Sequence, residues 1–301
     1  MRMFDEIKTY LLVTKPGIIL GNLITASGGF LLASKGSVDG ALLLSTLTGL
    51  SLVIASGCIF NNVIDRDLDR RMIRTRRRAL VTGRLSPQAA LCYGTTLGIA
   101  GMALLLATTH RLCVLTVLAG FIIYVILYSL VLKPRSGYST VIGSLAGAAP
   151  PLAGYFAVTH RFDMEAIILL FIFGLWQMPH CYAIAIFRLA DYKSANIPIL
   201  PVRRGIATTR KHIIAHMLTF TAAAVTLTLG GYTGYRYLGI TVVICLFWLF
   251  TAWMVPKRGN DQIWSRQLFI NSILTITILC TMMSIDFTVP FTREMLLAYK
   301  P

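Results

Sequence analysis

Acidic and amide side chains gather directly after one long apolar stretch of the chain. Asn61, Asp65 and Asp69 are spaced four residues apart, so on a continuous helix they lie on one face, with Asn62 beside it and Asp67 pointing away. Carboxylate and amide oxygens are ligands that Mg²⁺ prefers, commonly together with substrate phosphates. The alternative is a charged cluster that ends a membrane span and is neutralised by ion pairs with nearby arginines. Repulsion between closely spaced acids favours the cation-binding site.

A second polar segment follows a later apolar stretch and contains Asp191, Tyr192 and Asn196. By itself this segment fits an ordinary solvated loop as well as it fits a binding site. His180 lies inside the apolar stretch before it, roughly 10 Å from the end of that stretch if it is helical. An ionisable side chain at membrane depth favours a functional role. A hydrogen bond to a neighbouring helix is the alternative, weighted equally.

Other polar residues interrupt or end apolar stretches. Lys133 could stabilise an anionic leaving group by its charge, and Tyr128 could donate a hydrogen bond to it. An interfacial aromatic belt explains Tyr128 equally well. Asn22 lies within the first apolar stretch, and His212 and His216 compete with His180 for its role.

The composition shows what kind of element must position these residues. The chain has 301 residues, of which only 13% are charged, whereas a soluble domain carries about 25%. Apolar stretches near 20 residues long, enough to cross about 30 Å of hydrocarbon as helices, predict one all-α integral-membrane domain over 1–301. The nine expected spans are 16–34, 40–61, 88–108, 112–132, 139–158, 166–187, 212–232, 237–255 and 267–287.

Basic residues predict the orientation of these spans. With the N-terminus inside, the inner segments carry 22 Lys and Arg residues and the outer segments carry 6. This asymmetry also explains the net charge of +16 better than nucleic-acid binding does. We therefore expect a multi-pass protein of the bacterial inner membrane, with a cytoplasmic N-terminus, an outer C-terminus and both polar segments on the cytoplasmic side. The two polar segments follow spans two and six, which suggests two four-helix halves and a ninth helix.

Taken together, the two polar segments resemble those of the UbiA superfamily of intramembrane prenyltransferases. The first motif of that superfamily, N-D-x-x-D-x-x-x-D followed by R-T-x-x-R, matches Asn61, Asn62, Asp65, Asp69, Arg74, Thr75 and Arg78. The second motif begins at Asp191. The chain departs from the motifs at Asn62, where most members have Asp, and at Ala195-Asn196, which replace a final carboxylate. Each departure removes a negative charge and puts a fully acidic two-metal arrangement in doubt.

Several runs are similar to one branch of this superfamily, whose acceptor is haem B. These runs are Thr14-Lys15-Pro16-Gly17, Asn61-Asn62, Trp176-Gln177-Met178-Pro179-His180, Asp191-Tyr192 and Asn196-Ile197-Pro198. The resemblance implies transfer of a farnesyl group from farnesyl diphosphate to a vinyl group of haem B, with addition of water, giving haem O and diphosphate. It implies Mg²⁺ as cofactor and haem B as substrate, with His180 as a possible axial ligand of the haem iron.

Each candidate residue then has an expected role. The metal ligands are Asn61, Asp65, Asp69 and Asp191; the catalytic residues are Asp65, Asp69, Arg74, Tyr128 and Lys133; the substrate-binding residues are Asn22, Asn61, Asn62, Arg78, His180, Asp191, Tyr192 and Asn196. There are two alternatives to farnesyl transfer to haem B: prenyl transfer to another aromatic or tetrapyrrole acceptor, and a membrane transporter. A transporter would place its polar residues near the midplane of the bilayer, whereas these lie at span ends. A contact with terminal oxidase assembly or haem A synthesis is left open.

Overall fold

A computed structural model describes residues 2–254 and 260–288. Within these residues nine helices are long and apolar enough to cross a membrane, and no strand occurs beyond an isolated bridge between Thr233 and Phe287. The long helices are α2 (Pro16–Ser34), α3 (Gly40–Ile64), α5 (Pro87–Thr108), α6 (Arg111–Ile122) continued by the π-helix η1 (Ile123–Leu132), α7 (Ser139–Thr159), α8 (Met164–Phe187), α10 (Leu200–Leu229), α11 (Tyr235–Trp253) and α12 (Asp261–Ile285). Three short helices are α1 (Arg2–Val13), α4 (Arg66–Arg71) and α9 (Leu189–Ser194). The expected all-α membrane fold is confirmed.

Two of the expected span boundaries are wrong. The seventh helix begins at Leu200 rather than His212, because a first helical segment precedes a kink at Gly205, whose non-helical φ of 78° suits glycine. The ninth helix begins at Asp261 rather than Gln267. Basic residues that hydropathy assigns to connections therefore belong to the first turns of these helices. Lys257, Arg258 and the expected end of the eighth span at residue 255 lie outside the described residues.

Several helices begin at residues that cap their free N–H groups. The carboxylate of Asp39 accepts hydrogen bonds from the backbone N–H of Ala41 and Leu42, both at 3.0 Å. The Ser86 hydroxyl accepts one from Ala89, and Pro87 occupies the first turn of α5. These local signals explain why the polar connections end where they do.

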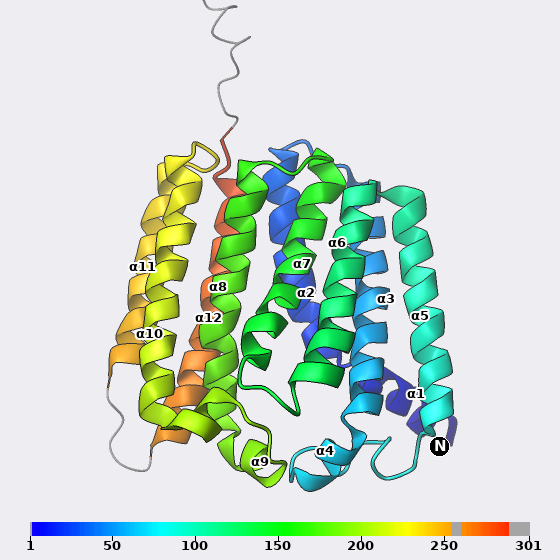
Figure 1. Ribbon diagram of the computed structural model, residues 1–301. Helices are drawn as coiled ribbons and strands as arrows, with labels where there is room; N and C mark the ends of the chain where they lie inside the picture. Colours follow the sequence, from blue (N-terminus) through cyan, green and yellow to red (C-terminus); the bar gives the residue numbers. More distant parts are fainter. Residues whose placement is uncertain (1, 255–259, 289–301) are drawn as a thin grey trace, which may run out of the picture.

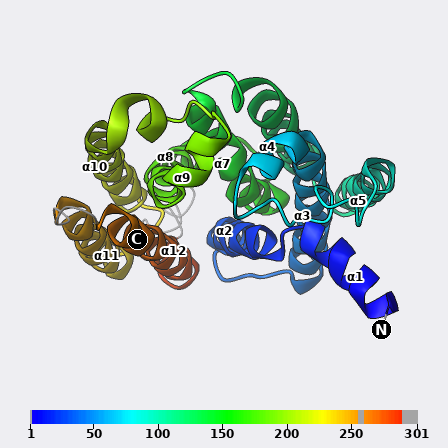
Figure 2. The same cartoon turned by 90° about the horizontal axis from the view of Figure 1, so that it is seen from below.

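The nine long helices form two groups of four and a closing helix. The first group runs from α2 to α6 with η1, the second runs from α7 to α11, and α12 packs against α8, α11 and α2 (Figures 1 and 2). Helices α2 and α7 join the groups at close range. A Cβ at Gly29 would lie 2.0 Å from the Pro151 carbonyl oxygen, and one at Gly154 would lie 2.1 Å from that of Ala26. Small residues thus allow the backbones of the two groups to meet.

The three short helices all lie at one end of the bundle (Figure 1), which we call the α4–α9 end. Seen from that end, α4 and α9 face each other across the centre (Figure 2). The Ser194 hydroxyl donates to the Arg71 carbonyl oxygen at 3.0 Å. Met72, Ala195, Ile197 and Ile199 form a buried apolar contact with Ala185. The connections that carry the two polar segments are therefore packed together.

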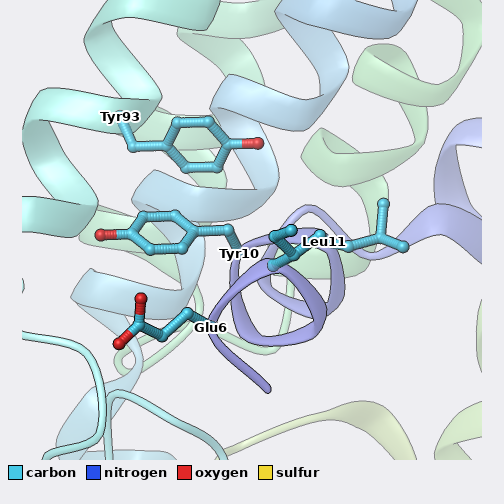
Figure 3. Close-up of a pocket in the computed structure, with 5 residues that line it drawn as sticks. Glu6, Tyr10, Leu11 and Tyr93 are labelled. Atoms are coloured by element: carbon cyan, nitrogen blue, oxygen red, sulfur yellow. The ribbon is translucent and has the colours of Figure 1, made fainter. Parts of the chain in front are cut away.

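Helix α1 lies beside α5 at the same end (Figure 1). The ring of Tyr10 meets the ring of Tyr93 edge to face, with centroids 5.1 Å apart, above a pocket that Glu6 and Leu11 also line (Figure 3). Phe4, Ile7 and Leu11 share one face of α1 and remain exposed. An exposed apolar face on a short helix at the end of a membrane bundle is typical of a helix that lies in the membrane surface.

Candidate functional site

The first polar segment keeps its helical spacing although α3 ends at Ile64. The backbone N–H of Asp65 donates to the Asn61 carbonyl at 2.9 Å, and that of Asp69 donates to the Asp65 carbonyl at 2.7 Å. Asn61, Asp65 and Asp69 are all buried, at 2–3% exposure, whereas Asp67 is exposed. The shared face expected for these three residues is present because the turn between α3 and α4 preserves the four-residue repeat.

Asp65 is the central carboxylate of this face. Its Oδ2 accepts a charge-assisted hydrogen bond from Lys133 Nζ and a second bond, at 2.9 Å, from Asn61 Nδ2. Its Oδ1 is buried and has no hydrogen-bond partner among the residues that the structure describes. A buried carboxylate oxygen without a partner is costly, so this atom marks a position where a cation or a donor is needed.

Asn61 connects Asp65 to the helix η1 and to the junction between α1 and α2. Its Nδ2 also lies 2.9 Å from the Ser129 hydroxyl on η1, and its Oδ1 accepts a hydrogen bond of 2.5 Å from Lys15 Nζ. Lys15 precedes α2 and has a positive φ of 56°. The pKa of Lys15 is lowered to about 8, mainly by burial; the nearby charges of Arg78 and Lys133 also lower it, whereas Cys58 and Asp65 raise it. Lys15 is not among the site residues expected from the sequence, although it lies in the run Thr14-Lys15-Pro16-Gly17 that carries part of the family resemblance.

Asp69 and Asn62 share one arginine. Arg78 Nη1 donates to Asp69 Oδ2 at 2.6 Å and to Asn62 Oδ1 at 3.0 Å. The ion pairs of Asp65 and Asp69 show that the neutralised-cluster interpretation describes part of this arrangement. Only Arg78, however, comes from the same segment; Lys133 comes from a different helix.

We define the polar cluster as these eight residues: Lys15, Asn61, Asn62, Asp65, Asp69, Arg78, Ser129 and Lys133. The second polar segment approaches it through Arg74, whose Nε lies 3.9 Å from Asp191 Oδ2. Burial lowers the pKa of Arg74 and raises the pKa of Tyr192 to about 12. Asn196 is exposed, with a φ of 55°.

The π-helix η1 aligns the residues that approach from the fourth span. The backbone N–H of Lys133 donates to the Tyr128 carbonyl five residues earlier, and the Ser129 hydroxyl donates to the Tyr124 carbonyl. Lys133 Nζ lies 6.0 Å from the centre of the Tyr128 ring. The wider turn of a π-helix, often found at functional sites, thus presents Ser129 and Lys133 together to Asn61 and Asp65.

Other expected site residues contact different parts of the bundle. The Asn22 amide donates to the Ile18 carbonyl of its own helix at 2.7 Å. His180 Nδ1 lies 2.7 Å from the Ser272 hydroxyl on α12, and its ring stacks on Trp176 with centroids 4.7 Å apart. His212 and His216 both lie near Tyr182. His180 thus has the helix-to-helix hydrogen bond of the alternative interpretation.

The polar cluster offers carboxylate and amide oxygens but few closely grouped acidic side chains to a divalent cation. In the described part of the chain, no group of three or more His, Cys, Asp and Glu side chains is close enough to hold a metal ion. The carboxylates of Asp65 and Asp69 instead face cationic side chains. The unpartnered Oδ1 of Asp65 and the nearby amide oxygens are nevertheless hard donors of the kind that Mg²⁺ accepts.

Known proteins resemble this chain in sequence and in fold. A model of the UbiA prenyltransferase family matches residues 22–273. A protein from Serratia proteamaculans (strain 568) named protoheme IX farnesyltransferase is 55% identical over 97% of this chain and 99% of that protein. One of the same name from Yersinia enterocolitica is 56% identical over 96% of this chain and 98% of that protein.

Two solved structures share the fold at low sequence identity. One concerns a digeranylgeranylglyceryl phosphate synthase, with a TM-score of 0.74 and 17% identity over 93% of this chain and 99% of that chain. The other is a UbiA homologue from Archaeoglobus fulgidus bound to GPP and Mg²⁺, with a TM-score of 0.67 and 18% identity over 92% of this chain and 100% of that chain. At these identities the likeness concerns the fold.

Proposed function

This chain belongs to the UbiA prenyltransferase family, and from that premise we propose that it farnesylates haem B. The reaction transfers a farnesyl group from farnesyl diphosphate to a vinyl group of haem B, with addition of water, and gives haem O and diphosphate. The name protoheme IX farnesyltransferase, carried by relatives 55–56% identical over nearly the whole chain, supports this donor and acceptor. The structural observation that carries the proposal is the polar cluster at the α4–α9 end.

Asn61, Asp65, Asp69 and Asp191 would hold Mg²⁺. The metal ion, when bound, supplies positive charge to the diphosphate of the donor. The buried Oδ1 of Asp65, which lacks a partner, supports this assignment. The Mg²⁺ and GPP bound by the A. fulgidus homologue support it at the level of the shared fold.

The cations of the cluster would stabilise the diphosphate as the allylic C–O bond breaks. Lys15, Arg78 and Lys133 now pair with Asn61, Asp69 and Asp65, and diphosphate oxygens offer them stronger anionic partners. Arg74, which lies near Asp191 of the second polar segment, would add a fourth positive charge. Tyr128 and Tyr192 would donate hydrogen bonds to the diphosphate. Asn62 would contribute indirectly, by binding Arg78. Asn196 would contribute from the second polar segment.

We place the acceptor among the helices near α8. His180 and Asn22 are its proposed contacts. The Nδ1 of His180 is engaged by Ser272, so Nε2 is the ring nitrogen that would meet the haem iron. The ring of Trp176, which stacks on that of His180, and the tilted ring of Phe269 beside His180 would suit a flat, apolar tetrapyrrole.

We further propose that the α4–α9 end faces the cytoplasm, with the N-terminus inside and the C-terminus outside. The support is the excess of Lys and Arg in the segments at this end. Farnesyl diphosphate would present its charged group at the membrane surface and its chain to the interior of the bilayer. Both substrates and the lipid bilayer are therefore the expected partners.

Product mass tests this function directly. Purified protein is incubated with Mg²⁺, haem B and farnesyl diphosphate, and the tetrapyrrole product is measured by mass spectrometry. We expect haem O. Asp65→Ala should remove the product, because the variant loses a metal ligand and leaves Lys133 without its counter-charge, while membrane insertion is retained.

Asp67→Ala is the matched control, because Asp67 lies two residues away and is exposed. It should retain activity. Turnover of a different acceptor, with no haem-derived product, would contradict the proposed acceptor. Full activity of a correctly inserted Asp65→Ala protein, or indifference of the reaction to a chelator, would contradict the metal assignment.

A further inference from the structure

Asn62 joins three separate parts of the α4–α9 end. Its Nδ2 donates to the Val13 carbonyl oxygen at 2.8 Å, and its Oδ1 accepts from Arg78 Nη1 at 3.0 Å. Val13 is the last residue of α1, so its carbonyl has no partner within that helix. Val13 and Asn62 are both buried. The amide therefore satisfies a backbone oxygen that water does not readily reach.

The orientation of the Asn62 amide follows from its two partners. A backbone carbonyl can only accept a hydrogen bond, and a guanidinium can only donate one. Exchanging the amide oxygen and nitrogen would set oxygen against oxygen and donor against donor. An aspartate, the residue that most members of the superfamily have here, could accept from Arg78 but could not donate to Val13. The side chain at position 62 therefore works as an amide.

The adjacent asparagine holds the other side of the same junction. Asn61 Oδ1 accepts from Lys15 Nζ, two residues beyond Val13. Lys15 has left-handed backbone angles, with φ of 56° and ψ of 67°, which a non-glycine residue keeps only where its surroundings hold it there. Asn61 thus binds the α1–α2 junction at Lys15, and Asn62 binds it at Val13. Without these two hydrogen bonds the position of the Lys15 ammonium would not be fixed.

We propose that Asn62 is a positioning residue. Its amide holds the α1–α2 junction through Val13 and orients Arg78. Lys15 and Arg78 are thereby positioned to bind the anionic group of the substrate. Asn62 itself contacts neither the metal ion nor the diphosphate. The kinetic part of this proposal rests on the proposed function, whereas the part about the junction does not. The departure from Asp at this position is then a change of role and does not merely reduce the charge of a metal site.

Asn62→Asp separates this role from that of a metal ligand, because the two roles predict opposite effects. A ligand changed from amide to carboxylate would lower the Mg²⁺ concentration needed for half-maximal activity and preserve turnover. A positioning amide changed to carboxylate would lose the bond to Val13 and repel that carbonyl. We then expect the KM for farnesyl diphosphate to rise about tenfold, as expected when one buried hydrogen bond is lost, with no lower Mg²⁺ requirement.

Hydrogen–deuterium exchange of the substrate-free, full-length protein measures the junction independently of catalysis. Backbone amides between Tyr10 and Leu20 should exchange about tenfold faster in Asn62→Asp than in the unsubstituted protein. Asp67→Asn, an exposed change in the same segment, should leave exchange unchanged. If Asn62→Asp does not insert, Asn62→Ala, which adds no charge, should show the same faster exchange.

Unchanged exchange at the junction in an inserted Asn62 variant would overturn the proposal, and so would an Asn62→Asp enzyme with an unaltered KM and a lower Mg²⁺ requirement. If exchange is faster in the Asn62 variants but the unsubstituted protein forms no haem O, the role of Asn62 at the junction stands. The absence of haem O would then reject the proposed function, so failure of the proposed function can be told apart from failure of the Asn62 proposal.

Discussion

Lys15 brings a positive charge into the polar cluster from the α1–α2 junction. The ammonium groups of Lys15 and Lys133 and the guanidinium of Arg78 face the carboxylates and amide oxygens of the first polar segment. Opposite charges held this close in a partly buried site stabilise each other, yet each can exchange its partner for a metal ion or a diphosphate. The arrangement suits a site whose occupant carries both charges, as a metal–diphosphate complex does.

The lowered pKa of Lys15 predicts a pH dependence. Burial, aided by Arg78 and Lys133, disfavours the charged form and sets the pKa near 8, against 10.5 for an ordinary lysine. As pH rises through about 8, Lys15 loses its proton and the diphosphate loses an attractive partner. The value of kcat/KM for farnesyl diphosphate, which reports groups of the free enzyme, should therefore fall above that pH.

Lys15→Arg tests the assignment, because arginine stays charged throughout this range. The fall in kcat/KM near pH 8 should disappear in the variant. The measurement is kcat/KM across pH 6.5–9.5, which covers about one and a half pH units on each side of the lysine pKa. Lys8→Arg, an exposed change in α1, should keep the profile of the unsubstituted enzyme. An identical fall in Lys15→Arg would show that another group titrates.

The π-helix η1 is the element that delivers two members of the cluster. Hydropathy predicts a helix over 112–132 but does not distinguish α from π turns, because an average over a window of residues does not record which face of the helix each residue occupies. The distinction matters here, since Ser129 and Lys133 must both face α3. Their alignment depends on two hydrogen bonds that each reach back five residues. The backbone N–H of Lys133 donates to the Tyr128 carbonyl, and the Ser129 hydroxyl donates to the Tyr124 carbonyl.

Deleting Leu130 should therefore abolish prenyl transfer. The residue is exposed on the outside of the bundle, and its loss would turn Lys133 by roughly a quarter of a helical turn away from Asp65. Leu130→Ala, which keeps the number of residues, should retain activity because it removes only an exposed side chain. Haem O formation and membrane insertion are measured for both. A deletion variant that inserts and remains active would show that the π turns do not position the site.

At the scale of the whole molecule, the bundle brings both polar segments to one end. Their contact is made by the Ser194–Arg71 hydrogen bond and by the apolar residues around Met72 and Ile197. Segments separated by more than a hundred residues thus lie in contact because spans two and six run in the same direction. The positive-inside asymmetry predicts that this end is cytoplasmic.

Reporter fusions test that orientation. Alkaline phosphatase, which folds only outside the cytoplasm, should be active when fused after Gly231, between α10 and α11, and inactive when fused after Gly83, between α4 and α5. A fluorescent protein that folds in the cytoplasm should give the reverse pattern. Active phosphatase at Gly83 would mean that the α4–α9 end faces outward, contrary to the proposal.

Local features of the site and fold could be predicted because they repeat along a single helix. The thickness of the bilayer determines the length of a span, so nine apolar stretches predict nine helices. The four-residue spacing of Asn61, Asp65 and Asp69 likewise predicts their shared face. The start of α10 at Leu200 was missed because a polar, arginine-rich stretch can still form helical turns, and hydropathy does not detect them.

By itself, the sequence determined the number of spans, the asymmetry of charge and which residues share a helical face, since each depends on neighbours along the chain. Only the tertiary structure decided that Lys133 pairs with Asp65, that Lys15 reaches Asn61 and that Asn62 holds the end of α1. A buried charge or carbonyl requires a partner, but that requirement does not specify which one. The choice depends on which helices become neighbours, and packing between distant segments determines that.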